Sequence, residues 1–286
     1  RDDFGGGLAA NYVRLIDCVG TKSAENGSVN AGTGILYCTD GSSTGIEVIR
    51  GSYTGTGGGN GNCACLWFDY AESLNIVGVL IQSAPTPLYF KHTDVNSSGT
   101  PGGTVKNCIF LSGNNRMSLN YVSYTNNAFY NSQLGLDEQG GGLDNSKNCT
   151  VSHNTFYDSD WMAAQQNGGA GTSSNTSTNN AMFGTSRFLS ATFSASDPSN
   201  SIDYSAVEGA GTNHYYRNST QRTMSSYNST YATEETHGVA GSMALVGGTT
   251  PGSTPANWAM SSGVGIGAAS DATDCGVDAT KLLTVN

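Results

Sequence analysis

The chain has 286 residues and a net charge of −10, from 22 acidic and 12 basic residues, and only 12% of its residues are charged. The charged fraction is about half of the roughly 25% typical of globular domains, and no basic run is present, so the composition argues against nucleic-acid binding. No apolar run approaches the roughly 20 residues that cross a bilayer, so we expect no membrane span. With 39 Gly, 14 Tyr and 9 Phe, the composition predicts a folded, turn-rich, mostly β protein.

The seven cysteines are spread along the chain rather than clustered: Cys18, Cys38, Cys63, Cys65, Cys108, Cys149 and Cys275. Their odd number excludes complete pairing within one chain. Most lie in apolar, strand-like contexts, so we expect buried thiols, and one or two disulfides between neighbouring segments remain open. The chain starts at Arg1 without a signal-peptide pattern, and we expect this start to be a processing point or the first ordered residue.

Taken in chain order, the sequence consists of short β-prone runs separated by polar corners, and helical periodicity is nearly absent. The corners recur. Four of them carry Asn at spacings of 20, 27 and 26 residues, namely Asn107, Asn127, Asn154 and Asn180. An apolar residue follows each by two positions, namely Ile109, Phe129, Phe156 and Met182. Upstream, "IVGVLIQS" fits the same frame with Gly78 at the corner, and downstream we expect the next corner at Asn213.

A β-rich repeat of 20–30 residues is typical of a solenoid, in which stacked turns share one long core. Asn at an equivalent corner tolerates left-handed backbone angles, and stacked amides hydrogen-bond from one coil to the next. We therefore interpret the four Asn residues as a structural ladder and the aromatic residue two positions later as stacked core.

The segments "SLNIVGVLIQS", "TVKNCIFLSGN" and "NCTVSHNTFYDS" resemble coils of the right-handed parallel β-helix superfamily, the pectate-lyase-like fold. The tail "SMALVGG…NWAMSSGVGIGAASDATDCGVDA" resembles the closing strand-loop-strand of such repeats. The resemblance implies an all-β fold, a single right-handed parallel β-helix with an Asn ladder and a loop-rich C-terminal part. We expect coils in 1–190, a Tyr/Ser/Thr-rich stretch of irregular coils or a loop insertion in 191–250, and a closing segment of the same domain in 251–286.

The resemblance also suggests where a polysaccharide lyase site would lie. Such enzymes need a base and a group that neutralises a uronate carboxylate, often with calcium. The strands after three corners carry the candidates Lys91, His92, Arg116, Asp137 and Glu138, although scattered charges on a solvated face are the alternative. Asp137, Glu138 and Asp144 offer oxygen ligands for calcium, but no dedicated calcium loop is present, so we assign no cofactor. "GIEVIRG" resembles a motif of alginate lyases and chondroitinase B, and we interpret it as coil-forming.

For function we therefore expect a non-catalytic structural protein of an exterior surface, a virion (phage capsid decoration or fibre) or a cell surface. β-Helices of this kind often assemble as trimers, so the resemblance implies a homotrimer that contacts a capsid shell or a glycan. The expected contact surface comprises Tyr204, Tyr215, Tyr216, Tyr227 and Tyr231, because Tyr supplies both stacking area and a hydroxyl. The alternative is a secreted lyase or hydrolase that acts on an acidic glycan.

Overall fold

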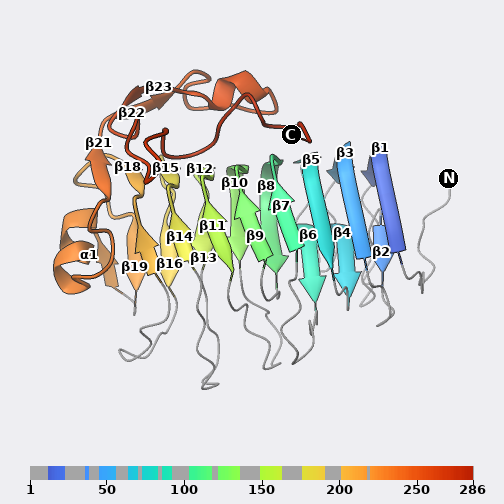
Figure 1. The fold of residues 1–286 in the computed structure, drawn as a ribbon, viewed down its shortest axis with the longest axis horizontal. Coiled ribbons are helices and arrows are strands. Elements are labelled where there is room, and N and C mark those ends of the chain that lie inside the picture. The colour runs from blue at the N-terminus through green and yellow to red at the C-terminus, as the bar shows by residue number, and fades with distance from the viewer. Residues whose placement is uncertain are drawn as a thin grey trace.

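In the computed structural model, the chain forms a parallel β-helix whose coils stack along one axis (Figure 1). The structure describes residues 12–22, 36–38, 45–55, 64–69, 73–82, 86–91, 103–117, 122–135, 149–162, 176–190, 201–217 and 220–285. Within these ranges, 21 strands belong to one continuous sheet. The predicted fold, a single parallel β-helix with an Asn ladder and a loop-rich C-terminal part, is confirmed.

Each coil contributes strands to three ladders. The first ladder contains the N-terminal halves of β1(Tyr12–Lys22), β3(Gly45–Gly55) and β5(Leu74–Gln82), then β7(Gly103–Lys106), β9(Val122–Thr125), β11(Thr150–Ser152), β14(Thr176–Thr178) and β17(Ser201–Asp203). The second contains the other halves of β1, β3 and β5, then β8(Ile109–Met117), β10(Ala128–Gly135), β12(Thr155–Tyr157), β15(Ala181–Phe183), β18(Ala206–Glu208) and β21(Val239–Gly241). The third contains β2(Leu36–Cys38), β4(Ala64–Asp69), β6(Thr86–Lys91), the ends of β8 and β10, β13(Trp161–Met162), β16(Phe188–Ser190) and β19(Tyr215–Arg217).

The first corner, between the first and second ladders, is made by one left-handed residue in every coil. The residues with positive φ at this position are Asp17, Arg50, Gly78, Asn107, Asn126, His153, Asn179 and Tyr204. Only a few per cent of residues other than Gly adopt such angles, and Asn, Asp and His do so most readily. The column therefore explains why these residue types recur at the corners.

The residue after each left-handed residue points into the coil, and here Asn127, Asn154 and Asn180 form the inner ladder. The side-chain amide of Asn154 donates to the Asn180 Oδ1 atom (3.1 Å) and to the Tyr124 carbonyl (2.9 Å). The Asn154 Oδ1 atom accepts from the backbone N–H of Asn127 (2.9 Å) and from its side-chain amide (3.1 Å). All three residues are buried, and each links its own coil to the next.

The sequence-based frame is shifted by one residue at Asn107. Asn107 lies in the left-handed column (φ 58°), and Cys108 occupies the inner position, where its backbone N–H donates to the Asn127 Oδ1 atom (3.1 Å). Phe110, not Ile109, therefore stacks on Phe129 inside the coil. The expectation of a corner at Asn213 is also wrong, because Tyr204 makes the next first-corner turn.

The lumen of the coils is filled by a stack of apolar side chains. Phe110, Phe129 and Phe156 stack with 4.9 Å between successive ring centroids and interplanar angles of 8° and 6°. Met182 and Val207 continue this core into the following coils. The repeat distance matches the 4.7–4.9 Å spacing of paired strands, so equivalent residues meet in every coil. Of the described cysteines, Cys18, Cys108, Cys149 and Cys275 are thiols, and all but Cys18 are buried.

After β19 the chain reverses and closes the end of the lumen. β20(Thr220–Arg222) pairs antiparallel with β19, and α1(Met224–Thr230) follows directly. Thr223 caps α1 by accepting a hydrogen bond from the Ser226 backbone N–H, and the helix buries Met224 and Tyr227 against the lumen core. Residues 201–217 and 239–241, within the stretch expected to be irregular, thus continue the ladders on either side of this cap.

The last part of the chain runs back along the outside of the second ladder (Figure 1). β22(Met243–Leu245) and β23(Met260–Gly263) pair antiparallel around a short 3-10 helix, η1(Pro255–Trp258). Residues 264–285, which we call the strap, then cross successive coils. Apolar residues of this part, among them Val277 and Leu282, form a second core with the outward-facing residues of the second ladder, including Ile109 and Phe183.

The left-handed asparagines hold the strap in place. The backbone N–H groups of Gly276 and Leu283 donate to the Asn179 and Asn107 carbonyls, both at 2.7 Å. Asn126 exchanges hydrogen bonds with the backbone of Asp278 through both its side-chain oxygen and its amide. In the pairs Asn126–Asn127 and Asn179–Asn180, the side chain of the first Asn therefore binds the strap and that of the second binds the neighbouring coil.

We expect Asn154→Leu to lower the free energy of unfolding by roughly 3–5 kcal/mol, because it leaves the Asn127 N–H and the Tyr124 carbonyl without partners in a buried site. Chemical denaturation followed by circular dichroism measures the change. Asn213→Leu is the matched control, since Asn213 is exposed and the substitution should stay within about 0.5 kcal/mol of the wild type. Equal stability of the two variants would contradict the ladder.

We expect Gly276→Ala to detach the strap locally. Gly276 has a φ of 91°, and an added Cβ would lie 2.5 Å from the Thr155 Oγ1 atom and 2.9 Å from the Ala181 Cβ atom. Gly267→Ala is the matched control, because Gly267 has a φ of 67° but nothing within 4 Å of the added atom. Both variants pay the roughly 1 kcal/mol of left-handed backbone strain, and Gly276→Ala should lose about 1–3 kcal/mol more. Hydrogen exchange of the strap amides should accelerate only in Gly276→Ala.

Candidate binding groove

The second corner, between the second and third ladders, carries a ladder of buried serines. The Ser132 backbone N–H donates to the Ser159 Oγ atom (3.0 Å), and the Ser159 N–H donates to the Ser186 Oγ atom (2.9 Å). The Ser159 and Ser186 hydroxyls in turn donate to the Tyr157 and Phe156 carbonyls. The hydroxyls of Ser159 and Ser186 are therefore committed to the backbone, and they form the floor of a groove of about 470 Å³.

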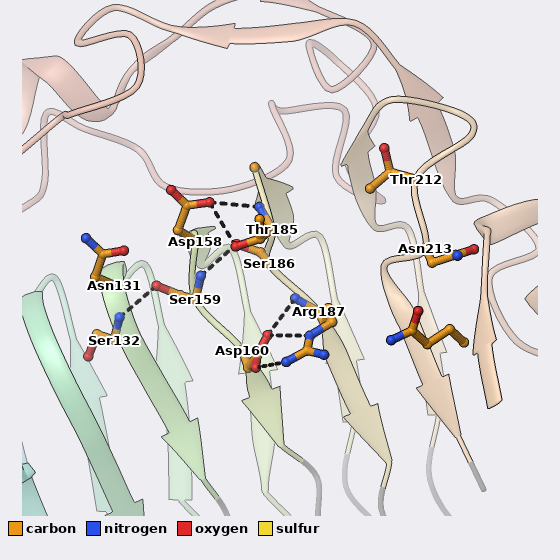
Figure 2. A pocket seen from close by; sticks show the side chains of 12 residues that line it. Asn131, Ser132, Asp158, Ser159, Asp160, Thr185, Ser186, Arg187, Thr212 and Asn213 are labelled. Carbon is orange, nitrogen blue, oxygen red and sulfur yellow. Dashed lines mark hydrogen bonds and ion pairs between the residues drawn. The ribbon is translucent and has the colours of Figure 1, made fainter. Parts of the chain in front are cut away.

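One wall of the groove is built by the left-handed residues of this corner. Asp158 (φ 45°) accepts two hydrogen bonds through its Oδ1 atom, from the Thr185 backbone N–H (2.8 Å) and the Thr185 hydroxyl (3.0 Å). Its second carboxylate oxygen accepts no hydrogen bond from the described residues. Asn131 (φ 46°) occupies the same position one coil earlier and is exposed. Figure 2 shows these side chains along the rim of the groove.

Asp160 and Arg187, which directly follow Ser159 and Ser186, form an ion pair. The Arg187 guanidinium donates to both oxygens of the Asp160 carboxylate, from Nη2 to Oδ2 at 2.8 Å and from Nε to Oδ1 at 3.2 Å (Figure 2). The Arg187 backbone N–H also donates to Oδ1 (3.1 Å). Donation of these hydrogen bonds to the Asp160 carboxylate raises the pKa of Arg187. Because three bonds fix the pair, Asp160 and Arg187 are held rigidly beside the serine floor.

The far end of the groove is fixed by His214, which is completely buried. Its Nδ1 atom lies 2.6 Å from the Ser186 carbonyl oxygen, and its Nε2 atom lies 2.7 Å from the Glu208 carbonyl oxygen. Both ring nitrogens therefore face backbone groups. His214 anchors the turn that presents Thr212 and Asn213, and Gln221 from β20 completes the lining.

Chemically, the described lining is suited to binding through hydrogen bonds. The ring nitrogens of His214 and the hydroxyls of Ser159 and Ser186 are occupied by backbone carbonyls, and Asp160 is occupied by Arg187. What remains accessible is a carboxylate oxygen, side-chain amides and hydroxyls. These groups recognise other hydroxyls and amides by donating and accepting at once.

Two of the residues proposed for a lyase site, Lys91 and Arg116, lie elsewhere, on the third ladder. Register pairs Arg116 of β8 with Tyr89 of β6, so Lys91 lies two residues beyond the partner of Arg116. Lys91 itself pairs with Asp69 of β4. His92, Asp137, Glu138 and the calcium candidate Asp144 lie outside the described residues.

The residues of "GIEVIRG" make contacts between coils. Arg50 donates to both carboxylate oxygens of Asp17, at 2.6 and 2.7 Å, and Glu47 pairs with Arg14 at 2.9 Å. Hydrogen bonding from Arg50 lowers the pKa of the Asp17 carboxyl. Both pairs join β1 to β3, in agreement with a coil-forming role for this segment.

The tyrosines expected on a contact surface are placed differently. Tyr215 of β19 and Tyr227 of α1 are fully buried, with 4.6 Å between their ring centroids, and they close the end of the lumen. The expectation is corrected for these two residues, because neither ring reaches solvent. Tyr204, Tyr216 and Tyr231 are half-buried.

The serine ladder and the groove were not recognised in the sequence, although a signal for them is present. Ser132, Ser159 and Ser186 follow one another at a constant spacing of 27 residues, at the ends of "NAFYNS" and "NTFYDS" and in "GTSR". The first two segments run from the Asn ladder to the Ser ladder and so specify both corners of their coils.

A second pocket, of about 710 Å³, lies between the strap and the first corner. Its charged groups largely pair with one another. The Lys281 ammonium lies 2.9 Å from the Asp278 carboxylate, and the His153 Nε2 atom lies 3.3 Å from the Asp271 carboxylate. Hydrogen bonding from Thr273 lowers the pKa of Asp271. We therefore assign these groups to the attachment of the strap.

Among the described residues, no group of three or more His, Cys, Asp or Glu side chains could hold a metal ion. In the same part of the chain, no helix is long and apolar enough to cross a membrane. Comparisons of the chain with protein-family models, with curated proteins and with solved structures found no match.

A buried acid closes the inner ladder. Glu235 is 2% exposed and accepts hydrogen bonds from the Tyr215 hydroxyl (2.8 Å) and the Ser205 backbone N–H (3.1 Å). Ser205 occupies the ladder position after Asn180, so the carboxylate takes the place of the next amide. Burial raises the pKa of Glu235 to about 7, the hydrogen bonds from Ser205 and Tyr215 oppose this rise, and the nearby Asp203 carboxylate adds to it.

Stability should consequently depend on pH through Glu235. Because the folded-state pKa of about 7 lies above the ordinary value of 4.5, the folded state holds this proton more tightly than the unfolded state. The contribution of Glu235 to the free energy of unfolding should be largest below pH 4.5 and should fall by about 3 kcal/mol as the pH rises to about 7. Asp203, Asp271 and Asp278, whose pKa values are lowered, change stability only at more acidic pH.

Glu235→Gln removes the ionisation and keeps an oxygen that accepts hydrogen bonds. Denaturation at several pH values should show the variant matching the wild type near pH 4.5 and exceeding its stability above pH 7. The substitution leaves every other titratable group in place, so the difference between the two curves isolates Glu235. Parallel curves would refute the assignment.

Proposed function

We propose that this protein is a non-catalytic structural component of an exterior surface, a rigid β-helical block of a virion or a cell surface. The observation that carries the proposal is the strap, which crosses coils on the outside of the second ladder and binds the carbonyls of Asn179 and Asn107 and the side chain of Asn126. A solenoid normally holds together only through contacts between neighbouring coils. The strap adds contacts that span several coils, and so it stiffens the block along its axis.

The chemistry of the chain supports the same role. Many of its described polar groups form hydrogen bonds within the fold, in the Asn ladder, the Ser ladder and the attachment of the strap. With only 12 Lys and Arg residues, the chain offers few sites for trypsin-like proteases. The resemblance of the coils to the pectate-lyase-like superfamily, whose members include phage tailspikes and adhesins, supports assignment to a virion, as a capsid decoration or fibre component.

Assembly with other chains is part of the proposal. The first coil exposes three large apolar side chains, Tyr12 (56% exposed), Ile16 (41%) and Val19 (81%). β1 pairs with β3 on one side, and in the described structure its other edge carries no strand. An apolar strip on an edge strand favours contact with protein, so we propose a homotrimer seated on a shell protein.

The second candidate is a secreted polysaccharide lyase or hydrolase that acts on an acidic glycan. The observation in its favour is that Lys91 and Arg116 lie on neighbouring strands of the third ladder, two positions apart in register. Two basic residues on neighbouring strands are what the neutralisation of a uronate carboxylate requires.

A turnover assay separates the two functions. The purified chain is incubated with alginate, pectate and chondroitin, and the ultraviolet absorbance of the unsaturated uronate product and the release of reducing ends are followed. We expect neither signal to rise above that of heat-denatured protein. Turnover that Lys91→Ala and Arg116→Ala both abolish would establish the enzyme and overturn the structural role.

Protease digestion and native mass spectrometry provide the positive readouts of the same proposal. The folded wild type should resist proteinase K and appear as three copies, whereas Gly276→Ala should be cleaved within the strap. Rapid digestion of the wild type in its described coils would contradict a rigid exterior block.

A further inference from the structure

The rim of the groove at the second corner carries polar side chains that serve no internal purpose. Asn131, Thr212, Asn213 and Gln221 line the groove and are exposed, and their side chains make no hydrogen bond with other described residues. By contrast, the hydroxyls of Ser159 and Ser186 on the floor are engaged with backbone carbonyls. An inert floor beneath a rim of unpaired amides and hydroxyls is the arrangement of a binding site, since a few convergent polar groups fix a ligand in its pocket.

The charges of the groove select the kind of ligand. Asp160 and Arg187 neutralise each other in a fixed ion pair, which leaves the free oxygen of Asp158 as the accessible charge of the rim. Glu208 lies close by, with its Oε2 atom 2.8 Å from the Gly184 backbone nitrogen. The local field is therefore negative, and it disfavours phosphate, sulfate and uronate groups by like-charge repulsion.

The hydrogen-bonding pattern matches hydroxyl groups. Each Asn or Gln side chain offers donors and an acceptor, and the Asp158 oxygen offers a charged acceptor, so the rim can both accept from and donate to a hydroxyl. A hydroxyl that donates to a carboxylate makes one of the stronger hydrogen bonds available to an uncharged ligand. A ligand with many hydroxyls in sequence uses all of these groups at once.

The direction of the groove follows from the coil repeat. Asn131, Asp158 and Thr185 belong to three successive coils, as Figure 2 shows, and paired strands lie about 4.8 Å apart. A ligand that touches all three runs along the helix axis, across the strands. Thr212 and Asn213 stand at the far end of the same groove.

We infer that this groove binds an uncharged, hydroxyl-rich glycan chain laid along the axis of the β-helix. The Asp158 carboxylate accepts from a sugar hydroxyl, and the amides of Asn131, Asn213 and Gln221 bind the adjacent sugars. The inference rests on the proposed exterior role, in which the chain meets a glycan. It places the glycan contact in this groove rather than on the tyrosines expected to form a contact surface.

The test is a binding titration by isothermal calorimetry with the full chain. The probes are neutral oligosaccharides (cellohexaose, mannohexaose and maltohexaose) and acidic ones (hexaguluronate and tetragalacturonate). The variants are Asp158→Asn, which replaces the free carboxylate oxygen, and the double variant Asn213→Ala with Gln221→Ala, which removes side chains without internal contacts. Ser253→Ala, at an exposed residue outside the groove, is the matched control.

We expect at least one neutral oligosaccharide to bind, each groove variant to weaken binding about tenfold or more, and the control to be unchanged. Binding of acidic probes only, binding that both groove variants leave intact, or no binding of any probe would overturn the inference. The proposed function fails separately, through turnover of a glycan or digestion of the block, so the two can be judged apart.

Discussion

Every coil of this protein has to turn at the same place as the coil beneath it, and one left-handed residue per coil satisfies that constraint at the first corner. Because parallel pairing is continuous through the corner, a displaced turn would move all later side chains of that coil to the opposite face. The aromatic stack of Phe110, Phe129 and Phe156 exists only because the register is held. The inner amides keep it by bonding each coil to the next.

The same corner also determines how the outside of the sheet is covered. A second ladder with apolar residues on both faces needs a layer on its outer side, and the chain supplies it by reversing after the ninth strand of that ladder. The asparagines at the turn present their carbonyls and amides outward, where the strap binds them as an extra strand would. The left-handed residue faces outward and the residue after it faces inward. Two consecutive residues therefore contact both the strap and the neighbouring coil.

The groove is a consequence of regular stacking at the second corner. Serines at a constant spacing form its floor, while the residues beside them differ between coils. Asn131, Asp158 and Thr185 occupy corresponding rim positions without being needed for the fold to the same degree. A repeated scaffold that presents variable polar groups at regular intervals is well suited to a ligand that is itself a repeating chain.

The sequence by itself determined the fold class and three members of the inner ladder, because the 27- and 26-residue spacings of Asn127, Asn154 and Asn180 record the coil length directly. It misplaced Asn107 by one residue, since Cys108 replaces the amide and the neighbouring Asn remains as the apparent match. Spacing could equally have revealed Ser132, Ser159 and Ser186. Only the tertiary structure decided the burial of Tyr215 and Tyr227, the raised pKa of Glu235, the path of the strap and the convergence on the groove. These features join residues from different coils or from a chain reversal, and local patterns carry no record of such contacts.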